Sequence, residues 1–170
     1  DIYFGGHGAP IGCFYHKLIL QKINKQAAII NIGGVSNITF LEKNRIIGFD
    51  LGPGNALIDD LTYHFYKKKY DKNGIYAKNG ILIKKIYNKI KKNNFFKKKY
   101  PKSLDRNHFK IIFDILKNYD SKDAIRTASL ITVYSIINGL NLIDKKIKLI
   151  ILTGGGRKNS FIFNNLKKKL

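Results

Sequence analysis

Four glycine clusters carry the residues of this sequence that could bind a ligand. They are GGHG (5–8), GG (33–34), GPGN (52–55) and GGG (154–156). Glycine lets the backbone approach a ligand without a Cβ in the way, and successive N–H groups in a turn bind phosphate. The last three clusters each follow a run typical of a strand, which is how a sheet presents loops to a nucleotide at its edge. They therefore predict a nucleotide site.

The pattern of these clusters differs from the two common nucleotide motifs. None matches the P-loop pattern GxxxxGK[ST], and none gives GxGxxG at the start of a helix, so a nucleotide would bind in another architecture. From the residues alone, two plainer interpretations stay open. Gly33–Gly34 could be a hairpin bulge, and GGG could be the turn that begins a helix.

Other polar residues could act either in ligand binding or in holding the local structure. Asp50 ends a predicted strand, where its carboxylate could reach Mg²⁺ or cap the following turn. Asn55 and Asp59 fit the start of a helix, as the N-cap and as an acidic partner of the helix dipole. We expect Cys13 in the core. Nothing resembles a zinc site among the scattered histidines, His16, His64 and His108.

The elements that must position these residues follow from apolar periodicity, which predicts an α/β chain. Strands are predicted over 27–32, 36–41 and 45–50, as an antiparallel meander, and before the GGG loop. Helices are predicted over 12–24, 55–67, 80–93, 120–142 and after the GGG loop. A turn-rich connector (70–80) and a Pro-marked loop (100–106), itself followed by a helical stretch, complete the chain.

The composition favours a cytoplasmic protein. No stretch approaches the roughly 20 uninterrupted apolar residues of a membrane span. The N-terminus lacks the basic and then apolar pattern of a signal peptide. Cys13 is the single cysteine of the sequence and cannot form an internal disulfide, which suits a reducing compartment.

The net charge of +21 would ordinarily suggest a nucleic-acid partner. However, only four of the 32 basic residues are Arg, whose guanidinium fork is favoured in phosphate and base recognition. The sequence is also rich in Ile, Asn, Tyr and Phe, which share A/T-rich codons with Lys, so codon bias explains the composition without a partner. We therefore expect no nucleic-acid partner and keep a basic binding module as an alternative.

Seven motifs, in chain order, carry a family resemblance: DIYFGGHGAPIG, AAIINIGGVSNITFL, IIGFDLGPGNALIDDL, YDKNGIYAKNG, YPKSLDRNHF, DAIRTASLITVYSI and LIILTGGGRKNSFIFNNL. In order and approximate spacing they resemble the anhydro-N-acetylmuramic acid kinase family, part of the actin-like ATPase and sugar-kinase superfamily. The resemblance implies a ribonuclease-H-like (actin-like ATPase) domain, with a mixed sheet and flanking helices. It also implies that residues 1–170 are mostly the C-terminal lobe of such a kinase, without the N-terminal lobe and the extreme C-terminus.

The resemblance further implies that ATP and Mg²⁺ are the cofactors. The second phosphate loop of the family would comprise Asn31, Gly33, Gly34 and Asn37, and the adenosine loop Gly154, Gly155 and Gly156. Asp50 is the candidate for contact with Mg²⁺.

The family's reaction cleaves 1,6-anhydro-N-acetylmuramic acid and phosphorylates its 6-oxygen, a step of peptidoglycan recycling. By resemblance Asp1 would be the base that activates water, while Gly6 and His7 would contact the sugar. The family more often has Gln at the position of His7. We expect no turnover from this segment alone and a possible homodimer of the full-length protein, and keep a degenerate, non-catalytic remnant as a further alternative.

Overall fold

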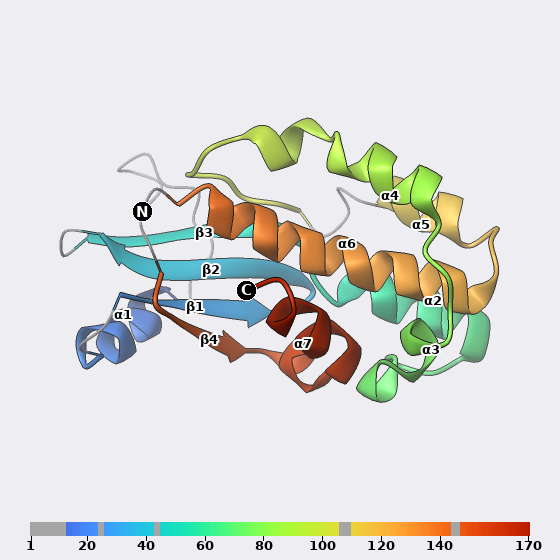
Figure 1. Ribbon diagram of the computed structural model, residues 1–170, viewed down its shortest axis with the longest axis horizontal. Helices are drawn as coiled ribbons and strands as arrows, with labels where there is room; N and C mark the ends of the chain where they lie inside the picture. The colour runs from blue at the N-terminus through green and yellow to red at the C-terminus, as the bar shows by residue number, and fades with distance from the viewer. Residues whose placement is uncertain (1–12, 24–25, 43–44, 106–109, 144–146) are drawn as a thin grey trace.

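The computed structural model describes residues 13–23, 26–42, 45–105, 110–143 and 147–170, and its centre is a four-stranded mixed sheet (Figure 1). The strands are β1 (Ala27–Ile32), β2 (Val35–Glu42), β3 (Arg45–Pro53) and β4 (Leu149–Thr153). Their order is β3-β2-β1-β4. The pairs β1–β2 and β2–β3 are antiparallel, which confirms the predicted meander, whereas β4 lies parallel to β1.

Strand β1 is buried on both faces, which explains its nearly continuous apolar sequence AAIINI. On one face, Ile30 and Ile32 join the main core of the protein. On the other face, Ala27 and Ile29 pack in a smaller cluster with Leu20 of the first helix. Successive side chains of a strand point to opposite faces, so this one strand connects the two clusters.

Seven α-helices surround the sheet in the described part of the chain: α1 (Cys13–Gln21), α2 (Ala56–Tyr66), α3 (Ile75–Lys78), α4 (Lys84–Lys91), α5 (Lys110–Leu116), α6 (Ser121–Asn141) and α7 (Ser160–Lys167). Helix α6 crosses one face of the sheet and α1 packs on the other (Figure 1). Helices α2, α3, α4 and α7 pack against α6. No helix in the described ranges is long and apolar enough to cross a membrane.

Helix α6 begins where the sequence predicts, at a cap made by Asp120. The Asp120 carboxylate accepts hydrogen bonds from the backbone N–H groups of Lys122 and Asp123, at 2.9 and 3.2 Å. These two N–H groups have no partner within the helix itself. Further along, the buried hydroxyls of Ser129 and Ser135 donate to carbonyls one turn back. A helix covered on most of its surface can therefore contain polar residues without leaving them unsatisfied.

The predicted helix over 80–93 is too long at its start, because α4 begins at Lys84. The N–H of Ile81 donates to Asp123 Oδ1 at 2.6 Å, and the N–H of Ile83 donates to Thr127 Oγ1 at 3.0 Å. These bonds to α6 hold residues 81–83 outside a helix. The connector over 70–80 also differs from its prediction, since it includes the short helix α3.

Candidate nucleotide site

Three of the glycine clusters meet at one end of the sheet. Strand β1 is parallel to β4, and both β1 and β3 are antiparallel to β2, so β1, β3 and β4 end at the same edge. The turn at Gly33–Gly34 follows β1, the segment 52–55 ends β3, and the loop 154–156 follows β4. The predicted convergence of these loops at a sheet edge is confirmed.

The Gly33–Gly34 turn directs its carbonyl groups into the protein. The N–H of Asn55 donates to the Gly33 carbonyl at 2.7 Å, and those of Gly54 and Ala56 donate to the Gly34 carbonyl at 3.0 and 3.1 Å. In a trans peptide the N–H points opposite to the C=O. The N–H groups of the same two peptide units therefore face away from the 52–55 segment, as a phosphate site requires.

The interpretation of Gly33–Gly34 as a bulge is wrong. The irregularity of the β2–β3 ladder lies between Ser36 and Asn37, and both glycines lie between the strands as a turn. Gly34 is exposed, and a Cβ placed on it would meet Ala56 Cβ at an ordinary 3.6 Å. Packing thus permits a larger residue at position 34, and what glycine adds there is open access to the backbone.

By contrast, close approach of the loops requires glycine at two other positions. A Cβ on Gly54 would lie 2.3 Å from the Gly33 carbonyl oxygen. Gly154 has φ +78°, and a Cβ on it would lie 2.5 Å from Asn31 Oδ1. Gly54 therefore lets the 52–55 segment pack closely against the Gly33 carbonyl, and Gly154 lets its loop pack closely against Asn31. Neither position has space for a side chain.

Asn55 occupies the predicted N-cap position of α2, but its side chain does not cap the helix. Its Nδ2 instead donates to the carbonyl of Ile32, at 3.0 Å, and so ties the start of α2 to the end of β1. Hydroxyls hold the same segment from two other elements. Thr132 of α6 donates to the Gly54 carbonyl at 2.9 Å, and Ser36 of β2 donates to the Gly52 carbonyl at 3.0 Å.

A row of polar residues crosses the sheet next to these loops. Asn31 of β1 pairs with Thr153 of β4 on one side and with Asn37 of β2 on the other, and Asn37 pairs with Asp50 of β3. Cross-strand partners share a face of the sheet. By strand alternation this face is the one on which α1 packs, opposite to α6. The structure thus brings Asp50 into one line with Asn31 and Asn37, which the sequence analysis assigned to a different part of the site.

Asp50 lies at the outer end of this polar row, beside a buried lysine. Its Oδ2 accepts a hydrogen bond from the Leu104 N–H at 2.7 Å, and its own N–H donates to the Lys102 carbonyl at 3.0 Å. Burial raises the pKa of Asp50, opposed by the Leu104 N–H and by the charge of Lys102. The Lys102 ammonium donates to the Phe95 carbonyl at 3.2 Å. Burial lowers the pKa of Lys102 to about 8, although the charge of Asp50 acts to raise it.

A pocket of about 420 Å³ opens between the loop 154–156, the start of α2 and the connector over 70–73. We call it the loop pocket. It is lined by Asn55, Ile58, Asp59, Tyr70, Asp71, Lys72, Asn73, Gly155, Gly156, Lys158 and Asn159. This volume is within the range of small-molecule sites, and the mixture of glycines, an aromatic ring and polar side chains suits a base and a ribose.

Sequence reasoning missed most of the loop pocket. It assigned Asn55 and Asp59 structural roles and treated Tyr70–Asn73 as a connector. The connector is held in place by Asp71, whose carboxylate accepts hydrogen bonds from the N–H groups of Tyr76 and Ala77, at 3.0 and 3.1 Å. Burial raises the pKa of Asp71. The signal that could have identified this wall was YDKNG itself, which belongs to one of the seven motifs.

The predicted sugar-side residues Asp1, Gly6 and His7 lie outside the described residues. Among the described residues, no group of three His, Cys, Asp or Glu side chains could hold a metal. Within the polar row of Thr153, Asn31, Asn37 and Asp50, Asp50 supplies the carboxylate and the other three supply amide and hydroxyl oxygens.

Comparison with known proteins identifies relatives over the whole chain. The family profile described as anhydro-N-acetylmuramic acid kinase matches residues 1–170. The chain is 33% identical to the anhydro-N-acetylmuramic acid kinase of Legionella pneumophila (strain Corby) over 174 residues, covering 100% of this chain and 48% of that protein. It is 32% identical over 187 residues to that of Haemophilus influenzae (strain ATCC 51907 / DSM 11121 / KW20 / Rd), covering 100% of this chain and 49% of that protein. The chain thus spans about half the length of the curated relatives it matches.

Among solved structures, the fold is similar to the activator of the 2-hydroxyisocaproyl-CoA dehydratase from Clostridium difficile with bound ADPNP. The TM-score is 0.54 at 14% sequence identity, covering 94% of this chain and 56% of that chain. Together with the mixed sheet and its flanking helices, this similarity confirms the predicted ribonuclease-H-like fold. Since the family profile extends over all 170 residues, the chain belongs to the anhydro-N-acetylmuramic acid kinase family.

Proposed function

We propose that this chain is the C-terminal lobe of an ATP-dependent kinase that cleaves and phosphorylates 1,6-anhydro-N-acetylmuramic acid to N-acetylmuramic acid 6-phosphate. The observation that carries the proposal is the convergence of three glycine loops at one sheet edge, beside a pocket of about 420 Å³. Family membership names the substrate. Because the relatives are about twice as long, the proposed cleft includes a second lobe.

The proposed nucleotide contacts divide between the turn and the loop pocket. The outward N–H groups of the Gly33–Gly34 turn would bind the β- and γ-phosphates, with Asn31 and Asn37 holding the turn. Gly154, Gly155 and Gly156 would leave room for the adenosine, placed between α2 and α7. The oxygen-rich polar row fits Mg²⁺, which prefers oxygen ligands and keeps water and phosphates in its coordination shell. Asp50 would hold the ion, which supplies charge neutralisation for phosphoryl transfer when bound.

In the proposed reaction, Asp1 takes a proton from a water molecule that attacks the anomeric carbon. The bond from that carbon to the 6-oxygen breaks, and the 6-oxygen forms a bond to the γ-phosphorus as ADP leaves. Gly6 and His7 would position the sugar. We place the complete enzyme in the cytoplasm, as a homodimer acting in peptidoglycan recycling and without a nucleic-acid partner.

The test is release of ADP on addition of 1,6-anhydro-N-acetylmuramic acid, measured on the chain within its complete reading frame. Asp1→Asn is expected to lower kcat by about 10²–10⁴, since the variant cannot accept a proton from water. Asp114→Asn, on the exposed face of α5, is the matched control and should retain full activity. A folded wild type without turnover would instead favour the degenerate remnant, and an active Asp1→Asn variant would refute the role of Asp1.

A further inference from the structure

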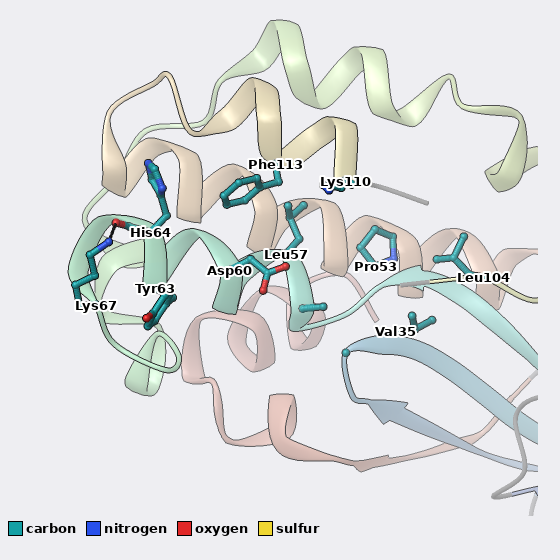
Figure 2. A pocket seen from close by; sticks show the side chains of 12 residues that line it. Val35, Pro53, Leu57, Asp60, Tyr63, His64, Lys67, Leu104, Lys110 and Phe113 are labelled. Carbon is teal, nitrogen blue, oxygen red and sulfur yellow. Dashed lines mark hydrogen bonds between the residues drawn. The ribbon is translucent and has the colours of Figure 1, made fainter. Parts of the chain in front are cut away.

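A second pocket lies between α2 and α5, and we call it the α2–α5 pocket (Figure 2). Its volume is about 530 Å³, which is within the range of small-molecule sites. It is bordered by the exposed side of α2, by the first turns of α5 and by the ends of β2 and β3. Of the predicted site residues that the structure describes, Gly34 alone is among its lining residues.

Apolar and aromatic side chains form the body of the α2–α5 pocket. Leu57 and Phe113 face each other across it, from α2 and α5 (Figure 2). The Phe113 ring is held edge-to-face by His64, with the ring centroids 5.8 Å apart. At the rim, Tyr63 leaves 60% of its surface exposed and offers an aromatic face. These surfaces suit a flat, apolar ligand.

The charges of the α2–α5 pocket favour an anion. Lys110 lies near Phe113 and Pro53, and Lys67 lies at the opposite end (Figure 2). Asp60 is the one acidic residue among the described residues that line the pocket. The Lys67 ammonium is tethered at the rim, 3.2 Å from the His64 carbonyl oxygen and 5.5 Å from the Tyr63 ring centroid. Lys110 is therefore the better partner for a ligand's charged group.

The first turns of α2 separate the α2–α5 pocket from the loop pocket. Ala56, Leu57 and Asp60 line the former, whereas Asn55, Ile58 and Asp59 line the latter. The two sets occupy opposite sides of one helix, as its period of 3.6 residues requires. A ligand in the α2–α5 pocket therefore need not overlap an adenosine in the loop pocket, whereas the proposed phosphate-binding turn shares Gly34 with the α2–α5 pocket.

We propose that the α2–α5 pocket binds a small organic anion with a flat apolar body. The body lies between Leu57 and Phe113, the anionic group pairs with Lys110, and Asp60 accepts a hydrogen bond from a donor on the body. The proposal rests on the lining of this pocket and stands whether or not the chain is part of a kinase.

The probe is 8-anilinonaphthalene-1-sulfonate, which combines aromatic rings, an N–H donor and one sulfonate. Its fluorescence is titrated with the full wild-type chain and with two variants, Lys110→Glu and Lys158→Glu. Both variants make the same change of net charge, but Lys158 lines the loop pocket. Lys110→Glu is expected to weaken binding at least about tenfold, because it reverses the charge that faces the sulfonate, while Lys158→Glu leaves it within about twofold.

Two further measurements sharpen the test. N-phenyl-1-naphthylamine has the same rings without the sulfonate, and its binding should be weaker and unchanged by Lys110→Glu. Saturating adenosine, which would occupy only the loop pocket, should leave the sulfonate probe bound. Equal losses in the two Glu variants would show adsorption to a basic surface, and displacement by adenosine would place the probe in the loop pocket; either result overturns the proposal. Circular dichroism verifies folding, and Lys110→Gln, with an expected smaller loss, replaces Lys110→Glu if that variant is misfolded.

Discussion

Lys102 keeps an ammonium group inside the protein, with a side chain that is only 4% exposed. Its Nζ lies 4.5 Å from the ring centroid of Phe95 and 5.8 Å from that of Phe49, and it donates to the Phe95 carbonyl. The rings and the carbonyl replace part of the water that the ammonium loses. Burial nevertheless remains the larger effect, since the pKa of Lys102 is lowered to about 8.

This pKa predicts a gain of stability in alkaline solution. Between pH 8 and pH 10.5 the unfolded chain holds more protons at Lys102 than the folded chain, so the free energy of unfolding rises with pH. The part of this effect between pH 7 and pH 10 corresponds to roughly 2–3 kcal/mol. Urea unfolding of wild type and Lys102→Met at pH 7 and pH 10 measures this contribution of Lys102 to the unfolding free energy. The groups that both proteins share titrate in both, so the difference between the two proteins isolates Lys102. A difference between the two proteins that is independent of pH would contradict the prediction.

At the glycine turn and the segment that contacts it, two Gly→Ala substitutions should change the unfolding free energy by very different amounts. Gly34→Ala places its Cβ in ordinary contact with Ala56, so we expect a change in unfolding free energy below about 1 kcal/mol. Gly54→Ala places its Cβ 2.3 Å from a backbone oxygen, which must move, so we expect a loss of more than about 2 kcal/mol. Thermal and urea unfolding measure both. If Gly34→Ala is folded yet binds ADP more weakly by calorimetry, the turn contacts the nucleotide; equal unfolding free energies for both variants would be contrary to the geometry.

Among the elements, the first turn of α6 contributes to the stability of the protein through its cap at Asp120. The Asp120 carboxylate satisfies two N–H groups that the helix leaves without partners. Asp120→Ala should therefore lower the unfolding free energy by about 1 kcal/mol, whereas Asp120→Asn or Asp120→Ser should retain most of it.

The control for this cap is Asp114 of α5, which forms an exposed ion pair with Lys117 at 2.8 Å. Water and salt screen such a pair, so Asp114→Ala should leave stability nearly unchanged. The four variants are compared by urea unfolding at neutral pH. Equal losses for Asp120→Ala and Asp114→Ala would show that charge, rather than capping, accounts for the effect.

Helix α4 shows where local patterns predict the wrong boundary. Its apolar spacing continues from residue 80, so the sequence predicts a helix from there. In the structure the N–H groups of Ile81 and Ile83 donate to side chains of α6 that lie more than 40 residues away. Such long-range partners have no local signature, and they make the helix begin later than its periodicity predicts.

For the whole molecule, α2 is the element that separates two candidate ligand sites. Its start is tied to β1 by Asn55 and to the glycine turn by the Gly34 carbonyl. One side of α2 lines the loop pocket and the other lines the α2–α5 pocket. The net charge of +21 is spread along the chain and does not itself define either site, which is why matched charge variants are needed to distinguish them.

The sequence by itself determined the α/β alternation, the meander of β1–β3 and the positions of the glycine loops. These are local properties: apolar period, turn residues and the absence of a side chain. The motifs in their order were also sufficient to indicate the family. The position of Asn55 at the start of α2 was predictable for the same reason, since an N-cap preference acts within one turn of the chain.

Only the tertiary structure decided which of these residues face one another. Asn31, Asn37, Asp50 and Thr153 form one row because strand register aligns them across the sheet, although more than 120 residues separate the first from the last. Asn55 bonds to Ile32 rather than to its own helix because the end of β1 presents a carbonyl there. Lys102 is buried because residues 100–104 run along β3. Register and burial depend on contacts between distant segments, which no local pattern encodes.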